Sequence, residues 1–171
     1  MRKVLYILGQ LDDHDIDWLA RVGRPRQLAA GATLIEEGRE QSDLFIVLDG
    51  QVDVSVAGVG RVATLGSGEI LGEMSFVDKS PPSATVAATA PTQILAVDRE
   101  TLARQLEADP GFASRFYLAV AMYLSVRLRA TMSRFGKDGA DAHDELNLEL
   151  LDTVHIAGAR FDRMIKRLLG V

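Results

Sequence analysis

The chain has 171 residues, of which 47% are hydrophobic and 25% charged, and its 19 basic and 24 acidic side chains give a net charge of −5. A chain of this length forms about one globular domain without cross-links, and the composition excludes disordered and collagen-like proteins. This net negative charge disfavours binding to the phosphate backbone of a nucleic acid, so we expect no DNA partner. The absence of cysteine excludes disulfides, thiolate metal sites and a catalytic thiol, and it suits a cytoplasmic protein.

The first 28 residues predict helices. Acidic side chains cluster at residues 12–17, ahead of apolar residues at helical spacing that include Ile16 and Leu19. Acidic residues favour the start of a helix because they complement its dipole.

No segment predicts secretion or a membrane span. The apolar stretch at residues 4–8 is shorter than the roughly 7–15 residues of a secretory signal. The longest apolar run, residues 116–124, is well below the about 20 residues that cross a bilayer. We therefore expect a soluble protein with no membrane partner.

From about residue 29 to residue 98 the pattern predicts short strands. Valines at positions 52, 54 and 56 alternate with polar residues, which places one face of a strand in the core. Residues 44–48 predict a preceding strand, and Asp49-Gly50 predicts a hairpin between the two. Residues 93–97 predict the last strand. Glycines at short intervals mark the turns, and this organisation is typical of a β-sandwich or jelly roll.

Residues 99–135 predict a return to helix. Asp109 is a suitable N-cap and Pro110 a suitable first-turn residue for a long helix. That helix carries two apolar stripes, one at positions 112, 116, 119, 123, 126 and 130 and the other at 117, 121, 124, 128 and 135. Because a helix that is apolar on two sides packs against two surfaces, we predict a homodimer seam over residues 110–135. The alternative is that the C-terminal segment covers the second stripe.

The last part of the chain predicts a linker and a further helix. Residues 136–142 form a short polar segment. Residues 143–171 have the pattern of an amphipathic helix, with apolar positions from Leu146 to Leu168. The predicted units are therefore a domain over residues 1–135, a linker over 136–142 and a helix over 143–171. We expect a protein partner to contact residues 143–169.

The stretch from Gly66 to Val86 carries the most specific signal. It contains Gly72-Glu73-Met74-Ser75-Phe76 and, a few residues later, Pro81-Pro82-Ser83-Ala84-Thr85-Val86. This pattern resembles the phosphate-binding cassette of the cyclic nucleotide-binding domain family, which includes catabolite activator proteins, protein kinase A regulatory subunits and nucleotide-gated channels. The resemblance spans residues 8 to about 135 and also rests on the Glu36-Glu37-Gly38 turn and the hairpin over residues 44–52. It implies an α+β fold that is mainly β, an eight-stranded jelly-roll barrel with N-terminal helices, a long C-terminal dimerising helix and an extra terminal helix.

The residue types of the cassette suit a phosphate ligand. A helical turn at Gly72 would direct backbone N–H groups toward an anion, and glycine permits close approach. A carboxylate accepts hydrogen bonds from a ribose hydroxyl, and side-chain hydroxyls donate to phosphate oxygens. The resemblance implies cyclic AMP or cyclic GMP as the ligand and the following binding residues: Gly72, Glu73, Met74, Ser75, Ser83, Ala84 and Thr85.

One position departs from the family pattern. Pro82 stands where the family has an arginine that holds the cyclic phosphate through two hydrogen bonds. Loss of such a partner costs roughly 2–5 kcal/mol, or about 30-fold to several thousand-fold in affinity. Lys79 and Arg61 are candidate substitutes, whereas the resemblance implies that Arg127 pairs with Glu73 and that Thr131 contacts the base.

Nothing in the sequence predicts catalysis. The three histidines lie far apart, and neither a nucleophile motif nor a phosphate loop with its lysine is present. We predict a non-catalytic regulatory sensor without a metal site, which binds a cyclic nucleotide or related phosphate ligand and signals through its C-terminal helices. The alternative is a degenerate fold that serves as a ligand-free interaction or scaffold subunit.

Overall fold

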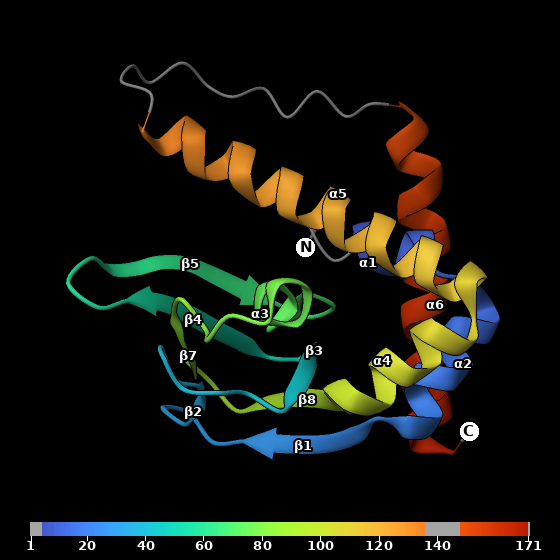
Figure 1. The fold of residues 1–171 in the computed structure, drawn as a ribbon, viewed down its shortest axis with the longest axis horizontal. Helices are drawn as coiled ribbons and strands as arrows, with labels where there is room; N and C mark the ends of the chain where they lie inside the picture. The colour runs from blue at the N-terminus through green and yellow to red at the C-terminus, as the bar shows by residue number, and fades with distance from the viewer. Residues whose placement is uncertain (1–4, 136–147, 171) are drawn as a thin grey trace.

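Eight strands form two antiparallel sheets, and helices from both halves of the chain cover one of them (Figure 1). The computed structural model describes residues 5–135 and 148–170. The strands are β1 (Arg24–Leu28), β2 (Thr33–Ile35), β3 (Asp43–Asp49), β4 (Gln51–Val56), β5 (Gly60–Gly66), β6 (Ile70–Leu71), β7 (Thr85–Ala88) and β8 (Thr92–Asp98). The helices are α1 (Leu5–Gln10), α2 (Asp13–Val22), α3 (Glu73–Asp78), α4 (Arg99–Ala108), α5 (Pro110–Phe135) and α6 (Leu148–Leu169).

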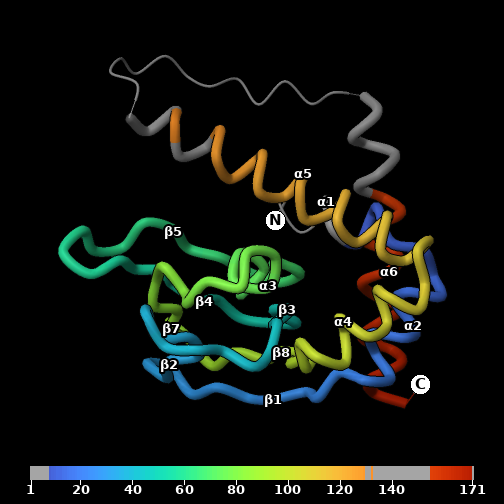
Figure 2. The backbone as a smooth tube through the Cα atoms, viewed as in Figure 1, coloured from blue at the N-terminus to red at the C-terminus, as the bar shows by residue number. Residues whose placement is uncertain are grey.

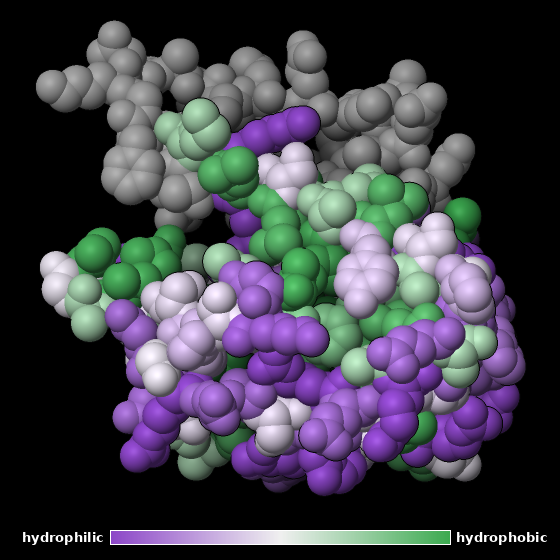
Figure 3. Space-filling view, in the orientation of Figure 1, coloured by the Kyte–Doolittle hydropathy of each residue, from purple (hydrophilic) through white to green (hydrophobic). Residues whose placement is uncertain are grey.

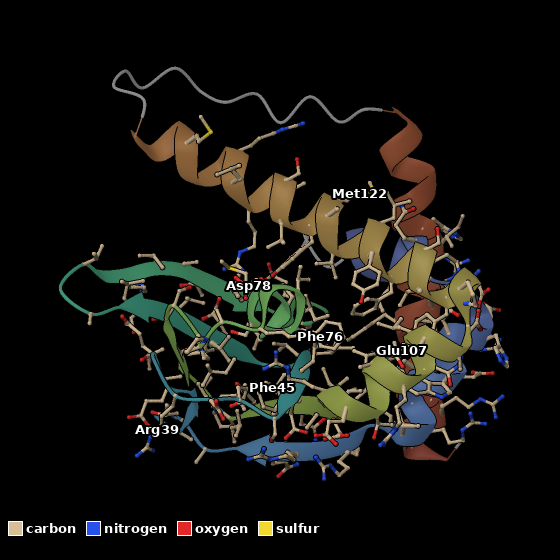
Figure 4. All side chains as sticks on the ribbon, in the orientation of Figure 1. Arg39, Phe45, Phe76, Asp78, Glu107 and Met122 are labelled. Atoms are coloured by element: carbon tan, nitrogen blue, oxygen red, sulfur yellow. The ribbon has the colours of Figure 1, made fainter. Side chains whose placement is uncertain are left out.

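The two sheets enclose the first apolar core. Their strand orders are β1-β8-β3-β6 and β2-β7-β4-β5. Phe45 lies opposite Ala96 in the first sheet and Val52 lies opposite Leu65 in the second, and all four side chains are buried in the core between the sheets (Figure 4). The predicted alternation along β4 is confirmed at Val52 and Val54, which are buried, whereas Val56 at the end of the strand is only half-buried. The fold is the predicted jelly roll, with its strands divided between two sheets.

Asp49 and Gly50 do not form the predicted hairpin turn. β3 pairs with β6 and β8, whereas β4 pairs with β5 and β7, so these two residues carry the chain from one sheet to the other. Gly50 has a φ of +94°, and a Cβ atom there would lie 2.5 Å from Thr92 Oγ1. The close crossing of two chain segments therefore requires glycine at this corner.

Residues 24–28 form β1, which corrects the expectation of helix across the first 28 residues. The Gly23 amide bonds to the Leu19 carbonyl at 2.9 Å and ends α2. Pro25 disfavours a helical conformation in the residue before it. β1 lies at the edge of the first sheet with four of its five residues exposed, so it has no alternation of apolar residues to reveal it.

A second apolar core lies between the outer face of the first sheet and the helices. Leu44, Ile46 and Leu95 on that face belong to one cluster with residues of α1, α2, α5 and α6. α5 buries much of its first predicted stripe, including Phe112, Phe116, Ala119 and Tyr123. α6 packs on α1 and α2, so the first and last helices of the chain lie side by side (Figures 1 and 2).

The described part of α6 leaves part of the second stripe of α5 uncovered, whereas Leu124 of that stripe packs against the second core. Tyr117 is 47% exposed and Leu128 is 61% exposed, and apolar side chains gather along α5 on the face seen in Figure 3. The predicted linker, residues 136–142, and the first part of the predicted last helix, residues 143–147, lie outside the described residues. Within the described ranges, no helix has both the length and the apolar character needed to cross a membrane.

Candidate functional site

The cassette borders a pocket that is partly open to solvent. Gly72 and the first residues of α3 form one wall, residues 82–84 before β7 form the second, and Arg127 of α5 reaches the third side. The floor is apolar and is made by side chains from four strands: Ile35, Val54, Leu71 and Val86.

α3 is held in place by unusual backbone conformations at both ends. Gly72 precedes the helix with a φ of +83°, and a Cβ atom there would lie 3.4 Å from the Asp43 carbonyl oxygen. Lys79 follows the helix with a φ of +58°, the one positive value among the described non-glycine residues. Between these points Glu73 and Ser75 are buried, whereas Met74 is exposed at the mouth of the pocket.

The central electrostatic feature of the pocket is an ion pair. Arg127 Nη1 donates to Glu73 Oε1 at 2.8 Å, with the two side chains 27% and 3% exposed. The guanidinium also lies 5.4 Å from the centre of the Tyr123 ring. Burial raises the pKa of Glu73, although the nearby Arg127 charge lowers it. The expected pairing of Arg127 with Glu73 is therefore formed, and it joins the cassette to α5.

The second wall is fixed by the turn that contains Glu37 and Gly38. The Gly38 amide donates to the Pro82 carbonyl at 2.8 Å, and the Glu37 amide donates to Thr85 Oγ1 at 3.1 Å. Pro82 is buried, and it lines the pocket where the family arginine is expected. The Thr85 hydroxyl thus positions this turn.

The structure brings most of the predicted site residues together. The predicted residues that line the pocket are Gly72, Glu73, Met74, Ser75, Ser83, Ala84 and Arg127. Thr85, Lys79 and Arg61 are not among the lining residues: Lys79 is exposed beyond α3, and Arg61 lies 3.4 Å from Asp53 on the neighbouring strand. The side chain of Thr131 lies outside the described residues. Among the described lining residues, Glu73 and Arg127 are the charged ones.

The apolar floor is absent from the predicted site. Val54 and Val86 face the core because their strands alternate, and that alternation is the signal that identifies them. Ile35 and Leu71 lie on strands of only three and two residues, which are too short for such a pattern.

Ion pairs also join α2 to both C-terminal helices. Asp15, 1% exposed, accepts two hydrogen bonds from Arg115 of α5 at 2.7 and 2.8 Å. Arg163 of α6 donates to both carboxylate oxygens of Asp17 at 2.8 and 2.7 Å, and Arg167 donates to the same carboxylate. Hydrogen bonds from Arg163 and Arg167 hold the pKa of Asp17 well below its usual range. The acidic cluster predicted only as a helix start is thus also a bridge between α5 and α6.

Known proteins are similar to this chain over the part that contains the cassette. Residues 25–109 match the family model of the cyclic nucleotide-binding domain. The cAMP-dependent protein kinase regulatory subunit of Eremothecium gossypii is 30% identical over 104 residues, which are 61% of this chain and 23% of that protein. The chain spans only 20% to 27% of the length of the curated relatives that it matches.

Solved structures share the fold as well. A cyclic nucleotide-binding domain from Methylobacillus flagellatus KT has a TM-score of 0.68 and 25% identity, covering 77% of this chain and 80% of that one. The N-terminal domain of a transcriptional regulator from Streptomyces coelicolor A3(2) has a TM-score of 0.61 and 30% identity, covering 82% of this chain and 100% of that one. With its two facing sheets and its cassette wrapped around a pocket, this chain belongs to the cyclic nucleotide-binding domain family.

Proposed function

We propose that this chain is a non-catalytic regulatory sensor whose pocket binds a cyclic nucleotide or a related phosphate ligand, with cyclic AMP and cyclic GMP as candidates. The observation that carries the proposal is the Arg127–Glu73 ion pair, because it connects the cassette directly to α5. A ligand whose ribose hydroxyls bind Glu73 competes with Arg127 for the carboxylate. Such a ligand shifts α5 to the extent that it binds the two arrangements with different affinities.

The lining of the pocket supports a ligand of this chemistry, because an apolar floor faces a few polar groups. The apolar floor suits a nucleobase, and the Ser83 hydroxyl lines the wall where it can donate to a phosphate oxygen. Arg127 is the one cation among the described lining residues and is already paired, so we expect weaker binding than an additional arginine would give.

The ion pairs of α2 support a route from the pocket to the C-terminal helix. A displacement of α5 acts on Asp15 through Arg115, and α2 in turn holds α6 through Asp17 and Arg163. The apolar face of α6 is packed on the body of the domain, so we propose that a protein partner meets residues 143–169 when this packing changes. Residues 143–147 of that range lie outside the described residues.

Titration calorimetry tests ligand binding. We would titrate the chain with cyclic AMP, cyclic GMP and a cyclic dinucleotide, beside the variants Pro82→Arg and Glu73→Gln. We expect one cyclic nucleotide to bind, Pro82→Arg to bind it at least about 30-fold more tightly, and Glu73→Gln to bind it more weakly. Absence of heat from both the natural chain and Pro82→Arg would contradict a nucleotide pocket.

A ligand-free scaffold subunit is the second candidate function. Pro82 favours it, because this residue lines the pocket at the position of the missing arginine. In the same calorimetry, the scaffold function predicts no heat with the natural chain and clear binding by Pro82→Arg. That result would mean that the pocket keeps its shape without its phosphate clamp.

We also propose that the chain is a homodimer through α5. Tyr117, Ala121, Leu124 and Leu128 follow the alternating spacing of four and three residues that is typical of a two-helix seam. Leu128→Glu is expected to yield a monomer in sedimentation velocity, whereas Arg129→Glu alters the charge of the exposed neighbouring residue and is the matched control. A monomeric natural chain, or a dimeric Leu128→Glu variant, would contradict this seam.

A further inference from the structure

Arg99 connects two chain segments that are distant in sequence and that both hold the pocket. It is the first residue of α4, directly after β8. Its Nη2 donates to the carbonyl of Ser75 in α3, and its Nη1 donates to the Gln41 carbonyl at 2.6 Å. Its backbone N–H donates to the Ser42 carbonyl at 3.0 Å. One guanidinium thus joins the cassette helix to the segment before β3.

On the cassette side, Arg99 donates a hydrogen bond to a carbonyl group that has no partner within its own helix. α3 has six residues, and the last four carbonyls of any α-helix lack partners within the helix. Ser75 supplies one of these carbonyls, and a cation near a helix C-terminus complements its dipole. A short helix gains more from such a contact than a long one, because it has few internal hydrogen bonds to hold its position.

The same guanidinium lies against the ring that connects α3 to α5. It is 6.0 Å from the centre of the Phe76 ring. Phe76 contacts Phe116 of α5 edge to face at 5.7 Å between ring centres, and Figure 4 shows Phe76 in the space between α3 and the helices that follow β8. Arg99 therefore contacts α3 at its backbone and at the side chain that faces α5.

On the other side, the segment held by Arg99 also holds the second wall of the pocket. Residues 36–42 connect β2 to β3, and their Glu37 and Gly38 amides bond to Thr85 Oγ1 and to the Pro82 carbonyl. A chain of contacts thus runs from Ser75 through Arg99 to residues 36–42 and on to Pro82. It joins the two walls of the pocket behind the ligand space, and Arg99 is not among the lining residues.

We propose that Arg99 is the positioning residue of the pocket: it fixes the separation of α3 from residues 82–84 and transmits a change in that separation to α5 through Phe76. This role rests on the proposed function of the pocket as a ligand site. Arg99 acts through α3 and through the turn at residues 36–42, without touching the ligand. Ligand affinity then depends on a residue outside the cassette.

The start of α4 does not depend on the Arg99 side chain, which makes a clean test possible. Asp98 caps the helix by accepting a hydrogen bond from the Thr101 amide at 2.8 Å. Arg99→Met keeps an unbranched apolar stem and removes both side-chain hydrogen bonds. Arg104→Met is the matched control, because Arg104 is an exposed arginine of the same helix that donates a hydrogen bond to Thr101 within that helix.

Hydrogen exchange of the full chain measures the proposed role without a ligand. In Arg99→Met we expect amides of residues 73–79 and 36–42 to exchange at least about tenfold faster, with residues 51–66 and 155–169 unchanged. Arg99→Lys, which keeps the charge and part of the hydrogen bonding, is expected to restore part of the protection. Arg104→Met should match the natural chain. Calorimetry with cyclic AMP should show weaker binding by Arg99→Met and natural binding by Arg104→Met.

Two results would overturn the proposal. One is natural exchange of both segments in Arg99→Met, and the other is faster exchange across the whole chain, which would indicate a general structural role. If Arg99→Met does not fold, hydrogen exchange of Arg99→Lys is measured instead and judged by the same two results. If the natural chain binds no cyclic nucleotide, the proposed ligand fails, whereas the exchange pattern still decides whether Arg99 positions the two walls.

Discussion

Removal of Arg127 leaves a buried carboxylate without its cation, so the substitution Arg127→Met has a cost that depends on pH. Glu73 is 3% exposed, and Arg127 Nη1 lies 2.8 Å from its Oε1. Breaking a buried pair from one side costs roughly 3–5 kcal/mol when the remaining charge stays ionised. Methionine keeps most of the packing of the arginine stem, so the lost charge dominates the effect.

Glu73 can limit this cost by binding a proton, which sets the pH dependence. Relative to an ordinary pKa of 4.5, holding the carboxyl protonated costs at most about 5 kcal/mol at pH 8 and under about 1 kcal/mol at pH 5. Burial already raises the pKa of Glu73 in the folded state, so this group lowers stability as pH rises through the window above 4.5. Loss of the Arg127 charge raises the pKa of Glu73 further, which widens the pH range over which stability falls as pH rises.

Urea unfolding at pH 5 and pH 8 measures this effect. We expect Arg127→Met to reduce the free energy of unfolding by about 3–5 kcal/mol at pH 8 and by far less at pH 5. In a Glu73→Gln background the same substitution should show little pH dependence, because the titrating group is absent. A cost for Arg127→Met that is equal at the two pH values, within about 0.5 kcal/mol, would refute the reasoning.

Three further predictions concern the fold. Gly50→Ala should lower the free energy of unfolding by about 2–4 kcal/mol in urea, because the new Cβ would lie 2.5 Å from Thr92 Oγ1. Gly31→Ala is the control: Gly31 has a φ of +83° with open space around it, so the cost should be about 1–2 kcal/mol. Equal costs would contradict the close crossing of the two chain segments at Gly50. Asp17→Asn should destabilise the chain at pH 7 and less at pH 2.5, because the stability that comes from the lowered pKa of Asp17 is progressively lost as pH falls from the usual range toward the folded-state pKa; a difference from the natural chain that is the same at both pH values would count against this. Phe116→Ala should cost about 3–5 kcal/mol and Leu118→Ala under about 1 kcal/mol in the same assay, since Phe116 is buried whereas Leu118 is exposed outside the proposed seam; equal costs would contradict the burial of Phe116.

Local patterns were sufficient to predict the cassette motif and three of the eight strands, β3, β4 and β8. The alternation at Val52 and Val54 is a property of one strand, and Gly72 to Thr85 is a contiguous motif, so neither depends on knowledge of distant contacts. The pairing of Arg127 with Glu73 was reached only through the family resemblance, because 54 residues separate the two.

The errors in the prediction arise where a local pattern permits two arrangements. Asp49-Gly50 marks a sharp turn, but nothing in the dipeptide says whether the next strand pairs with the last one or joins the opposite sheet. β1 is exposed on both faces, so it lacks the period that distinguishes strand from helix. Lys79 lies close to the cassette in sequence, yet the chain turns it away from the pocket after α3. The direction of a side chain relative to a cavity depends on the assembled fold.

The packing of α6 on α1 also affects how the chain folds during synthesis. Arg160 donates to the carbonyls of Leu8 and Gly9, which lie 152 and 151 residues earlier in the sequence. A ribosome that adds about 5–20 residues per second needs roughly 8–30 s to travel that distance. Throughout this interval the apolar residues of α1 and α2 lack the helix that completes their core. The newborn chain therefore keeps these apolar residues exposed until α6 emerges and closes contacts of very long sequence separation.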